Sequence, residues 1–161
     1  MMFNPDTSPA SLYMPSLETA ARSLKIVPIV APVHSDLEIE TAITTLGREP
    51  GGGLVVPPDV FMGAHHASII SAAARNNVPA VYPQSQHARD GGLLSYGRYQ
   101  SFEGMRGAAT YVDRILRGEK PGDLPVQFPT KFEMAVNLKT AKALGLAVPQ
   151  SILLRADEVI E

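Results

Sequence analysis

The chain alternates between two kinds of apolar pattern, and the first kind predicts helices. In several stretches, apolar residues recur three and four positions apart, which places them on one face of an α-helix. Each of these stretches is therefore expected to form an amphipathic helix with one buried face. The stretches are Leu17–Leu24, Ile39–Leu46, Ile70–Ala74 and Met105–Leu116.

The second kind of pattern is a short apolar run without alternation, which is typical of strands buried on both faces of a parallel sheet. These runs lie between the helical stretches, so strands and helices follow each other in turn. That order, with right-handed crossovers, predicts an α/β fold with a doubly wound parallel sheet. The predicted strands are Ile26–Ala31, Leu54–Val56, Ala80–Tyr82 and Leu93–Tyr96.

The two ends of the chain depart from this regular order. Met2-Phe3, followed by Asn4-Pro5-Asp6, is typical of the last step of a strand and its turn. We therefore expect the chain to begin inside a strand and to be a fragment of something longer. After Gly97 the sequence predicts a helix at about Gln100–Arg117, a Pro- and Gly-rich linker at Lys120–Pro125, a strand at Phe132–Asn137, a short helix at Lys139–Leu144 and a last turn or helix within Pro149–Glu161.

Composition and charge narrow the class of protein. The 161 residues are 45% hydrophobic and 19% charged, which is ordinary globular usage and suits one domain or two small ones. The formal net charge of −2 argues against a nucleic-acid partner, because nucleic-acid binders usually carry a basic domain. The chain has no Cys, which excludes disulfides, thiol catalysis and Cys-ligated metals.

No apolar run approaches the roughly 18 residues of a membrane span and no export signal is visible, so the chain as written is expected to be cytoplasmic.

No catalytic or metal-binding motif stands out. Gly51–Gly53 precede the strand Leu54–Val56 instead of following it, which favours a tight loop over a phosphate cradle. His65 and His66 are adjacent, and adjacent side chains on a helix point in different directions, so a shared metal is disfavoured. His87 is isolated in a loop and is interpreted as a surface residue. With no nucleophile motif and no spaced pair of carboxylates, we expect no enzyme activity, no bound metal and no cofactor.

The loops that follow the predicted strands offer a different chemistry. Ligands of open α/β sheets bind outside the carboxyl ends of the strands. These loops carry aromatic rings, carboxylates, amides and an imidazole, a mixture that suits a small polar molecule held between rings and hydrogen-bonding groups. The candidate ligand-binding residues are Asn4, Asp6, His34, Asp59, Tyr82, Gln84 and Tyr96.

These candidates also have structural explanations. Asp6 and Asp59 stand where the N-cap of the next helix is expected. Tyr82 and Tyr96 end apolar strands and could pack in the core, and His34 could be a surface residue. We nevertheless expect both tyrosine rings to face the ligand side of the sheet, because both stand at the carboxyl ends of predicted strands.

Several stretches resemble a known family. They are FNPDT, AAARSL, REPGGGLVVPPD, AARNNVPAVYP, GGLLSYG, YVDRILRGEKPGDLPVQFPTKFEMAVNLKTAKALGL and VPQSILLRADEVIE, and together they span nearly the whole chain. Through them the chain resembles the C-terminal part of ABC-transporter substrate-binding proteins of the tryptophan/tyrosine type, which have a type I periplasmic-binding fold. The resemblance implies a periplasmic binding protein without catalysis. Such a protein holds a small amino-acid-like molecule or organic acid between two lobes and passes it to an ABC permease.

The resemblance also implies a division of the chain. Residues 1–96 are similar to the second, Rossmann-like lobe, and residues 97–161 to the hinge crossing and the C-terminal portion of the first lobe, a helix–strand–helix extension. Most of the first lobe has no counterpart in this sequence, so the chain looks truncated. The apolar faces of the predicted helix at Met105–Leu116 and of the strand at Phe132–Asn137 would then lack a partner. We therefore expect a homo-oligomer, most simply a twofold dimer.

Two other functions remain open from the sequence. The chain could be an oligomerising remnant that binds no ligand, or a doubly wound enzyme that depends on a nucleotide. The loop Asn4–Pro9 lacks the glycines of a phosphate-binding loop, which counts against the enzyme.

Overall fold

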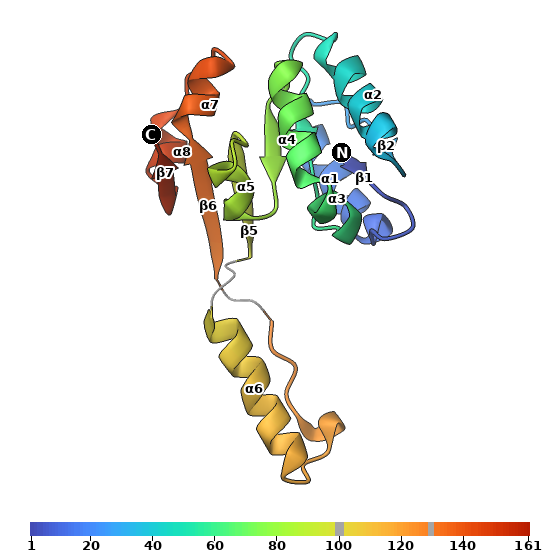
Figure 1. The fold of residues 1–161 in the computed structure, drawn as a ribbon, viewed down its shortest axis with the longest axis vertical. Coiled ribbons are helices and arrows are strands. Elements are labelled where there is room, and N and C mark those ends of the chain that lie inside the picture. Colours follow the sequence, from blue (N-terminus) through green and yellow to red (C-terminus); the bar gives the residue numbers. More distant parts are fainter. Residues whose placement is uncertain (99–101, 129–130) are drawn as a thin grey trace.

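The computed structural model describes residues 1–98, 102–128 and 131–161. Most of the molecule is built around one mixed sheet, shown in Figure 1. β3, β4 and β5 are parallel, β6 runs antiparallel to β5, and β7 is parallel to β6. The result confirms the predicted α/β fold with a mostly parallel sheet. In spatial order, the five strands are β3 (Leu54–Val55), β4 (Ala80–Tyr82), β5 (Leu94–Arg98), β6 (Phe132–Asn137) and β7 (Glu158–Ile160).

Two further strands and a set of helices complete the fold. β1 (Met2–Phe3) and β2 (Ala31–Pro32) form a separate parallel pair. The helices are α1 (Ala10–Ser23), α2 (Asp36–Gly47), α3 (Val60–Ala64), α4 (His66–Arg75), α5 (Ser85–Arg89), α6 (Phe102–Leu116), α7 (Leu138–Ala143) and α8 (Gln150–Leu153), with a 3-10 turn at Pro121–Asp123.

One hydrophobic core joins the two sheets. It contains Met2 from β1, Leu54 from β3 and side chains of α2 and α4, the two helices that pack against each other. Ile39 of α2 and Ile69 of α4 are almost completely buried. The apolar face predicted for Ile39–Leu46 therefore packs inward as expected, and α2 begins where the hydroxyl of Ser35 accepts the backbone N–H of Glu38.

The segment before β2 is less regular than its sequence predicts. Ile26–Ala31 was expected to be a buried strand, but β2 contains only Ala31 and Pro32. Val27 is 82% exposed and Ile29 is 64% exposed. Pro28 and Pro32 have no N–H to donate to a strand ladder, which explains why this apolar run forms so little of the sheet. On α1, only Ala21 of the predicted face Leu17–Leu24 is buried.

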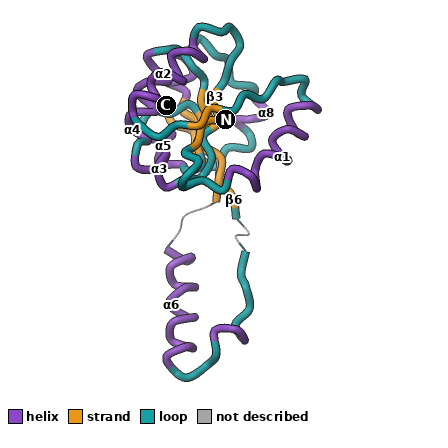
Figure 2. The backbone as a smooth tube through the Cα atoms, turned by 90° about the vertical axis from the view of Figure 1, so that its right-hand side faces the viewer, coloured by secondary structure: helices purple, strands orange, loops and turns teal. Residues whose placement is uncertain are grey.

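Residues 102–128 form an arm that projects away from the rest of the molecule, as Figures 1 and 2 show from two directions. β5 leads into the arm and β6 follows it in the chain. Tyr111 ties the arm together by donating its hydroxyl to the carbonyl oxygen of Pro125 at 2.5 Å. In the part of α6 whose side chains the structure describes, Val112 is 55% exposed and Leu116 is 81% exposed. Met105 of the predicted stripe lies outside that part.

The predicted strand Phe132–Asn137 forms, as β6, and joins the same sheet as β3 and β4. It pairs with β5 at every position from Leu94 to Arg98. β7 then extends the same sheet, where only a last turn or helix was predicted. The physical reason is that β5 offers an open edge of unpaired backbone groups, and a six-residue strand of the right length can satisfy all of them.

Within the described residues, no helix has the length and hydrophobicity needed to cross a bilayer.

Candidate functional site

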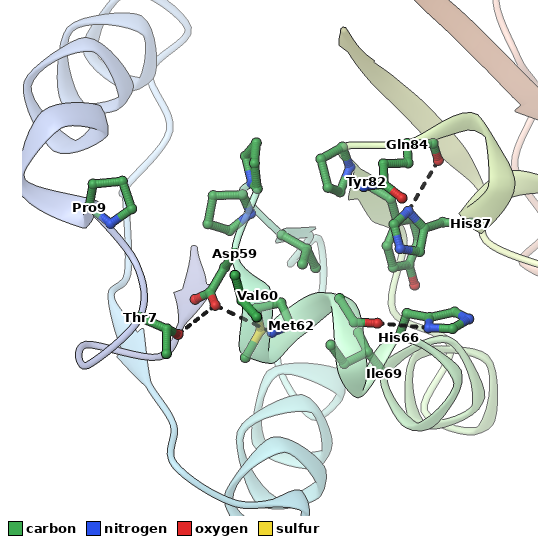
Figure 3. A pocket seen from close by; sticks show the side chains of 15 residues that line it. Thr7, Pro9, Asp59, Val60, Met62, His66, Ile69, Tyr82, Gln84 and His87 are labelled. Carbon is green, nitrogen blue, oxygen red and sulfur yellow. Dashed lines mark hydrogen bonds between the residues drawn. The ribbon is translucent and has the colours of Figure 1, made fainter. Parts of the chain in front are cut away.

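A pocket of about 470 Å³ opens at the carboxyl ends of β3 and β4 (Figure 3). Its volume suits a small ligand, and its position is the one where open α/β sheets bind ligands. The lining comes from the loop after β1, from the β3–α3 loop, from α3 and α4, and from the segment that joins β4 to α5. The lining residues are Thr7, Pro9, Val56, Pro57, Pro58, Asp59, Val60, Met62, Gly63, His66, Ile69, Tyr82, Pro83, Gln84 and His87.

Asp59 at the edge of the pocket is held by bonds within the protein. Its Oδ2 accepts the backbone N–H of Asn4 at 3.0 Å, and its Oδ1 accepts the hydroxyl of Thr7 at 2.6 Å. Oδ1 also accepts the backbone N–H of Phe61 at 2.8 Å, which caps the N-terminus of α3. The carboxylate therefore joins the loop after β1 to the start of α3, and these bonds use most of its acceptor capacity.

Three rings form one side of the pocket. The ring of Tyr82 stacks on the imidazole of His87 with centroids 5.5 Å apart, and His66 meets His87 edge-on at 5.4 Å. Tyr82 and His87 are buried, with 2% and 6% of their surface exposed. Apolar side chains such as Met62 and Ile69 also line the pocket. An arrangement of rings and apolar surface with few polar groups can hold a flat or apolar ligand and orient it through those groups.

Burial changes the protonation of this side of the pocket. It raises the pKa of the Tyr82 hydroxyl, which stays protonated at neutral pH. It also lowers the pKa of His87, because a buried imidazolium loses its hydration, and the nearby His66 lowers it further. The carbonyl oxygen of Gln84, 3.1 Å from Nδ1 of His87, and the carboxylate of Asp90 act in the opposite direction and offset only part of the effect.

His66 links the two helices that border the pocket. It stands at the start of α4, and its Nε2 lies 3.6 Å from a carboxylate oxygen of Asp90, at the end of α5. Its Nδ1 lies 2.9 Å from the carbonyl oxygen of Gly63. Both ring nitrogens of His66 therefore have partners inside the protein, and the face of its ring remains for the pocket.

Three of the sequence-predicted candidates meet in the pocket. Asp59, Tyr82 and Gln84 all line it, because each follows or ends a strand whose carboxyl end forms the pocket floor. Asp59 also has the capping role that was its structural alternative, and Tyr82 is also a core residue.

The structure places the other four candidates outside the pocket lining. Asn4 is buried, and its side-chain oxygen accepts the backbone N–H of Asp6 at 2.8 Å. Asp6 is exposed and lies 3.9 Å from His34, which is half-exposed. Tyr96 is 53% exposed and stacks on Phe132 of β6 at 5.9 Å.

Sequence reasoning missed both histidines of the pocket. His66 was considered as a partner of His65 in a metal site, which was disfavoured, and His87 was interpreted as a surface residue. One signal was available for His87, because it stands three positions after Gln84 and so one helical turn from a candidate residue. Nothing in the sequence shows that His66 and His87 meet, because that contact depends on how α4 and α5 pack. Among residues 1–98, 102–128 and 131–161, no group of three or more His, Asp or Glu side chains could hold a metal ion.

Comparison with known proteins identifies the family. The model of a family described as ABC transporter substrate binding protein matches residues 1–160. The chain belongs to this family. The ABC transporter substrate-binding family is a class of binding proteins and not of enzymes. No curated protein matches the chain.

Solved structures share the fold of this substrate-binding family member. A conserved domain protein from Vibrio cholerae superposes with a TM-score of 0.86 at 23% identity, over 98% of this chain and 53% of that one. An ABC domain from Streptococcus pneumoniae, in complex with L-Trp, gives 0.85 at 21% identity, over 99% of this chain and 55% of the other. A ligand-free, open substrate-binding protein with adhesive properties from Clostridium difficile gives 0.66 at 21% identity, over 99% and 52%. The chain thus spans about half the length of these structures.

Proposed function

We propose that this protein is a solute-binding component of an ABC transporter, and that the pocket between α3, α4 and α5 contacts the solute without chemical change. The observation that carries the proposal is the pocket itself, placed at the carboxyl ends of β3 and β4 in a chain of the substrate-binding family. Its volume and its ring-lined side suit one small molecule.

We propose an amino-acid-like molecule or a small organic acid as the solute. The rings of Tyr82, His87 and His66 offer a surface for an aromatic or other apolar side chain, and Gln84 offers an amide that can both donate and accept. The Streptococcus relative in complex with L-Trp is an example of an aromatic amino acid held by a similar fold.

The remaining parts of the proposal concern the surroundings of the pocket. The solved structures are about twice as long as this chain. A second wall of the binding cleft would therefore come from a lobe outside these 161 residues. The solute would then lie in a cleft between lobes, and a permease in the membrane would receive it from the periplasmic side. The β5–β6 crossing that bears the arm would serve as part of the hinge.

A second candidate function has one observation in its favour. The exposed stripe on α6, with Ile115 40% and Leu116 81% exposed, is the kind of apolar face that protein interfaces bury. A chain that uses this face only to associate with another copy would be an oligomerising remnant. Self-association and ligand binding are measured separately, so the two functions can be told apart.

A thermal-shift panel of amino acids and small organic acids, with L-tryptophan as the first probe, tests the proposal. A ligand at a hundredfold excess over its Kd stabilises the folded state by about 2.7 kcal/mol, which a melting curve resolves. We expect at least one compound to raise the melting temperature of the unaltered chain. A panel without any shift, on a protein that melts cooperatively, would favour the remnant.

A matched pair of variants places the binding in the pocket. Gln84→Ala removes a lining amide, and Gln150→Ala removes an amide on α8, which does not line the pocket. Losing one hydrogen bond to a neutral group costs about 0.5–1.5 kcal/mol, so Gln84→Ala should weaken binding up to about tenfold. Gln150→Ala should leave the affinity unchanged, and equal affinities in both variants would contradict this placement.

A further inference from the structure

The strands that bear the arm, β5 and β6, contact the segment that follows β4, beside the pocket. Gly97 of β5 and Glu133 of β6 face each other in the antiparallel ladder, close to where each strand meets the arm. A Cβ atom on Gly97 would lie 1.9 Å from the carbonyl oxygen of Pro83. Only glycine allows β5 to pass this close, so the backbone of Pro83 rests directly on the strand.

Glu133 of β6 contacts Ser85, two positions after Pro83. Its Oε1 accepts the hydroxyl of Ser85 at 2.7 Å in a partly buried setting, 48 positions apart in sequence. Ser85 is the first residue of α5 and directly follows Gln84. β5, which leads into the arm, and β6, which follows it, therefore both contact the segment Pro83–Ser85.

That segment forms one wall of the pocket. We define the pocket wall as residues 82–87, of which Tyr82, Pro83, Gln84 and His87 line the pocket. Inside the wall, the carbonyl oxygen of Gln84 lies 3.1 Å from Nδ1 of His87, and the ring of His87 stacks on Tyr82. A shift of Pro83 thus reaches the ring of Tyr82 directly, and a shift of Ser85 reaches the ring of His87 through its neighbour Gln84.

The other end of α5 has its own attachments. Arg89 forms a bidentate pair with Glu158 of β7, and the side-chain amide of Asn137 donates to the carbonyl oxygen of Ala88 at 2.9 Å. These bonds fix the C-terminal end of α5 without Glu133. At the N-terminal end, next to the pocket, Gly97 lies against Pro83 and Glu133 accepts the hydroxyl of Ser85.

We propose that Glu133 is a positioning residue of the binding site, which, together with Gly97, holds the pocket wall against the strands that bear the arm. Its carboxylate acts through Ser85 and Gln84 and does not line the pocket itself. This proposal rests on the proposed function. A wall fixed to the strands that bear the arm would set the position of the ligand-contacting rings relative to the surface that the arm binds.

The imidazole titration of His87, followed by NMR without any ligand, tests this role. The chain has 4 His, which single substitutions assign. His87 faces the rings of His66 and Tyr82 and the carboxylate of Asp90, and Arg89 follows on its own helix two positions later. Burial is the main cause of its lowered pKa, so a released wall should admit water and raise the pKa of His87 toward its ordinary value.

The variants separate positioning from folding. Glu133→Ala and Ser85→Ala should each raise the pKa of His87, and the double variant should raise it no further than either single one. Glu133→Gln keeps an oxygen that can accept from Ser85, and it should restore the original titration. Glu119→Ala removes a carboxylate of the arm that pairs with Arg114, and it should leave His87 unchanged.

An unchanged His87 titration in a folded Glu133→Ala variant would overturn the positioning role. So would a double variant whose effect is the sum of the single ones, because the two side chains would then act independently. The experiment contains no ligand, so its failure is distinct from a failure of the proposed function, which only a ligand panel can show.

Discussion

At the scale of single residues, the pocket combines side chains that stabilise the fold with side chains left for a ligand. Asp59 belongs to the first kind, since its oxygens accept from Asn4, Thr7 and Phe61. Gln84 belongs to the second, because it lines the pocket and its side-chain amide has no hydrogen bond within the described residues. The Asp59 carboxylate of this pocket is therefore structural, and the polar group left for a ligand is the Gln84 amide.

Replacing Asp59 should cost stability before it affects binding. Asp59→Ala removes the N-cap of α3 and the bonds to Asn4 and Thr7, and loss of such a cap costs roughly 0.5–2 kcal/mol. Asp59→Asn keeps a side-chain oxygen and should lose less. Urea denaturation measures both values, and an Asp59→Ala variant as stable as the unaltered chain would contradict the structural role.

His87 should make the stability of the protein depend on pH. Its pKa in the folded state lies below its ordinary value of 6.5, so the unfolded chain takes up a proton first as the pH falls. Its contribution is fully present above about pH 6.5 and is lost as the pH falls toward the folded-state pKa. His87→Phe keeps a ring against Tyr82 but cannot titrate, and its unfolding free energy should fall less over this range. Parallel pH profiles for the two proteins would contradict the assignment.

At the scale of elements, the backbone of β5 passes close to Pro83, beside the pocket. Gly97→Ala would place a Cβ atom 1.9 Å from a backbone oxygen, so the strand or the wall has to move. Overpacking of this kind costs typically about 1–3 kcal/mol. Gly122→Ala is the matched control, because nothing lies within 4 Å of a Cβ built there. Chemical denaturation should separate the two variants, and equal stabilities would argue against a close strand–wall contact.

The same scale shows what the sequence could and could not predict. The helices α2 and α4 and the strands β3 and β4 follow from local apolar patterns, because side chains of each belong to the hydrophobic core. The run Ile26–Val30 follows the pattern of a buried strand yet lies exposed, because two prolines and the pairing partner decide the outcome. The pairing of β6 with β5 could not be predicted from the sequence either. The arm of some thirty residues separates the two strands, and pairing over such a separation leaves no local signal.

The site was predictable to a similar degree. Tyr82, Gln84 and Asp59 follow from the rule that ligands bind at the carboxyl ends of parallel strands. The same rule also selected Tyr96, which lies outside the lining because β5 continues past the pocket edge toward the arm. His66 enters the pocket through the packing of α4 against α5, a tertiary contact that no spacing in the sequence encodes.

At the scale of the whole molecule, the arm is an apolar surface without a cover in the described chain. Leu116, Val126 and Phe128 are each about 80% exposed. Burying one such side chain contributes about 1.5–3 kcal/mol, so several together favour association. We expect a homo-oligomer, most simply a twofold dimer, when these 161 residues are studied alone.

Light scattering on the unaltered chain and on Leu116→Lys measures this association. The unaltered chain should show the mass of an oligomer at micromolar concentration, and a charge on the exposed stripe of α6 should shift it toward the monomer. Lys142→Ala, a change on α7 outside the arm, should not. If the unaltered chain scatters as a monomer, the exposed face of the arm does not bind a second copy of the chain.

The central claim is that the pocket between α3, α4 and α5 binds a small solute, and the most direct measurement follows the pocket histidines during a ligand titration. L-tryptophan and the other compounds of the panel are added to the protein while NMR records the four imidazoles. The account predicts saturable shifts at His66 and His87, which line the pocket, with His34 unchanged. Binding that moves none of the pocket imidazoles, or a panel in which no compound binds at all, would contradict it.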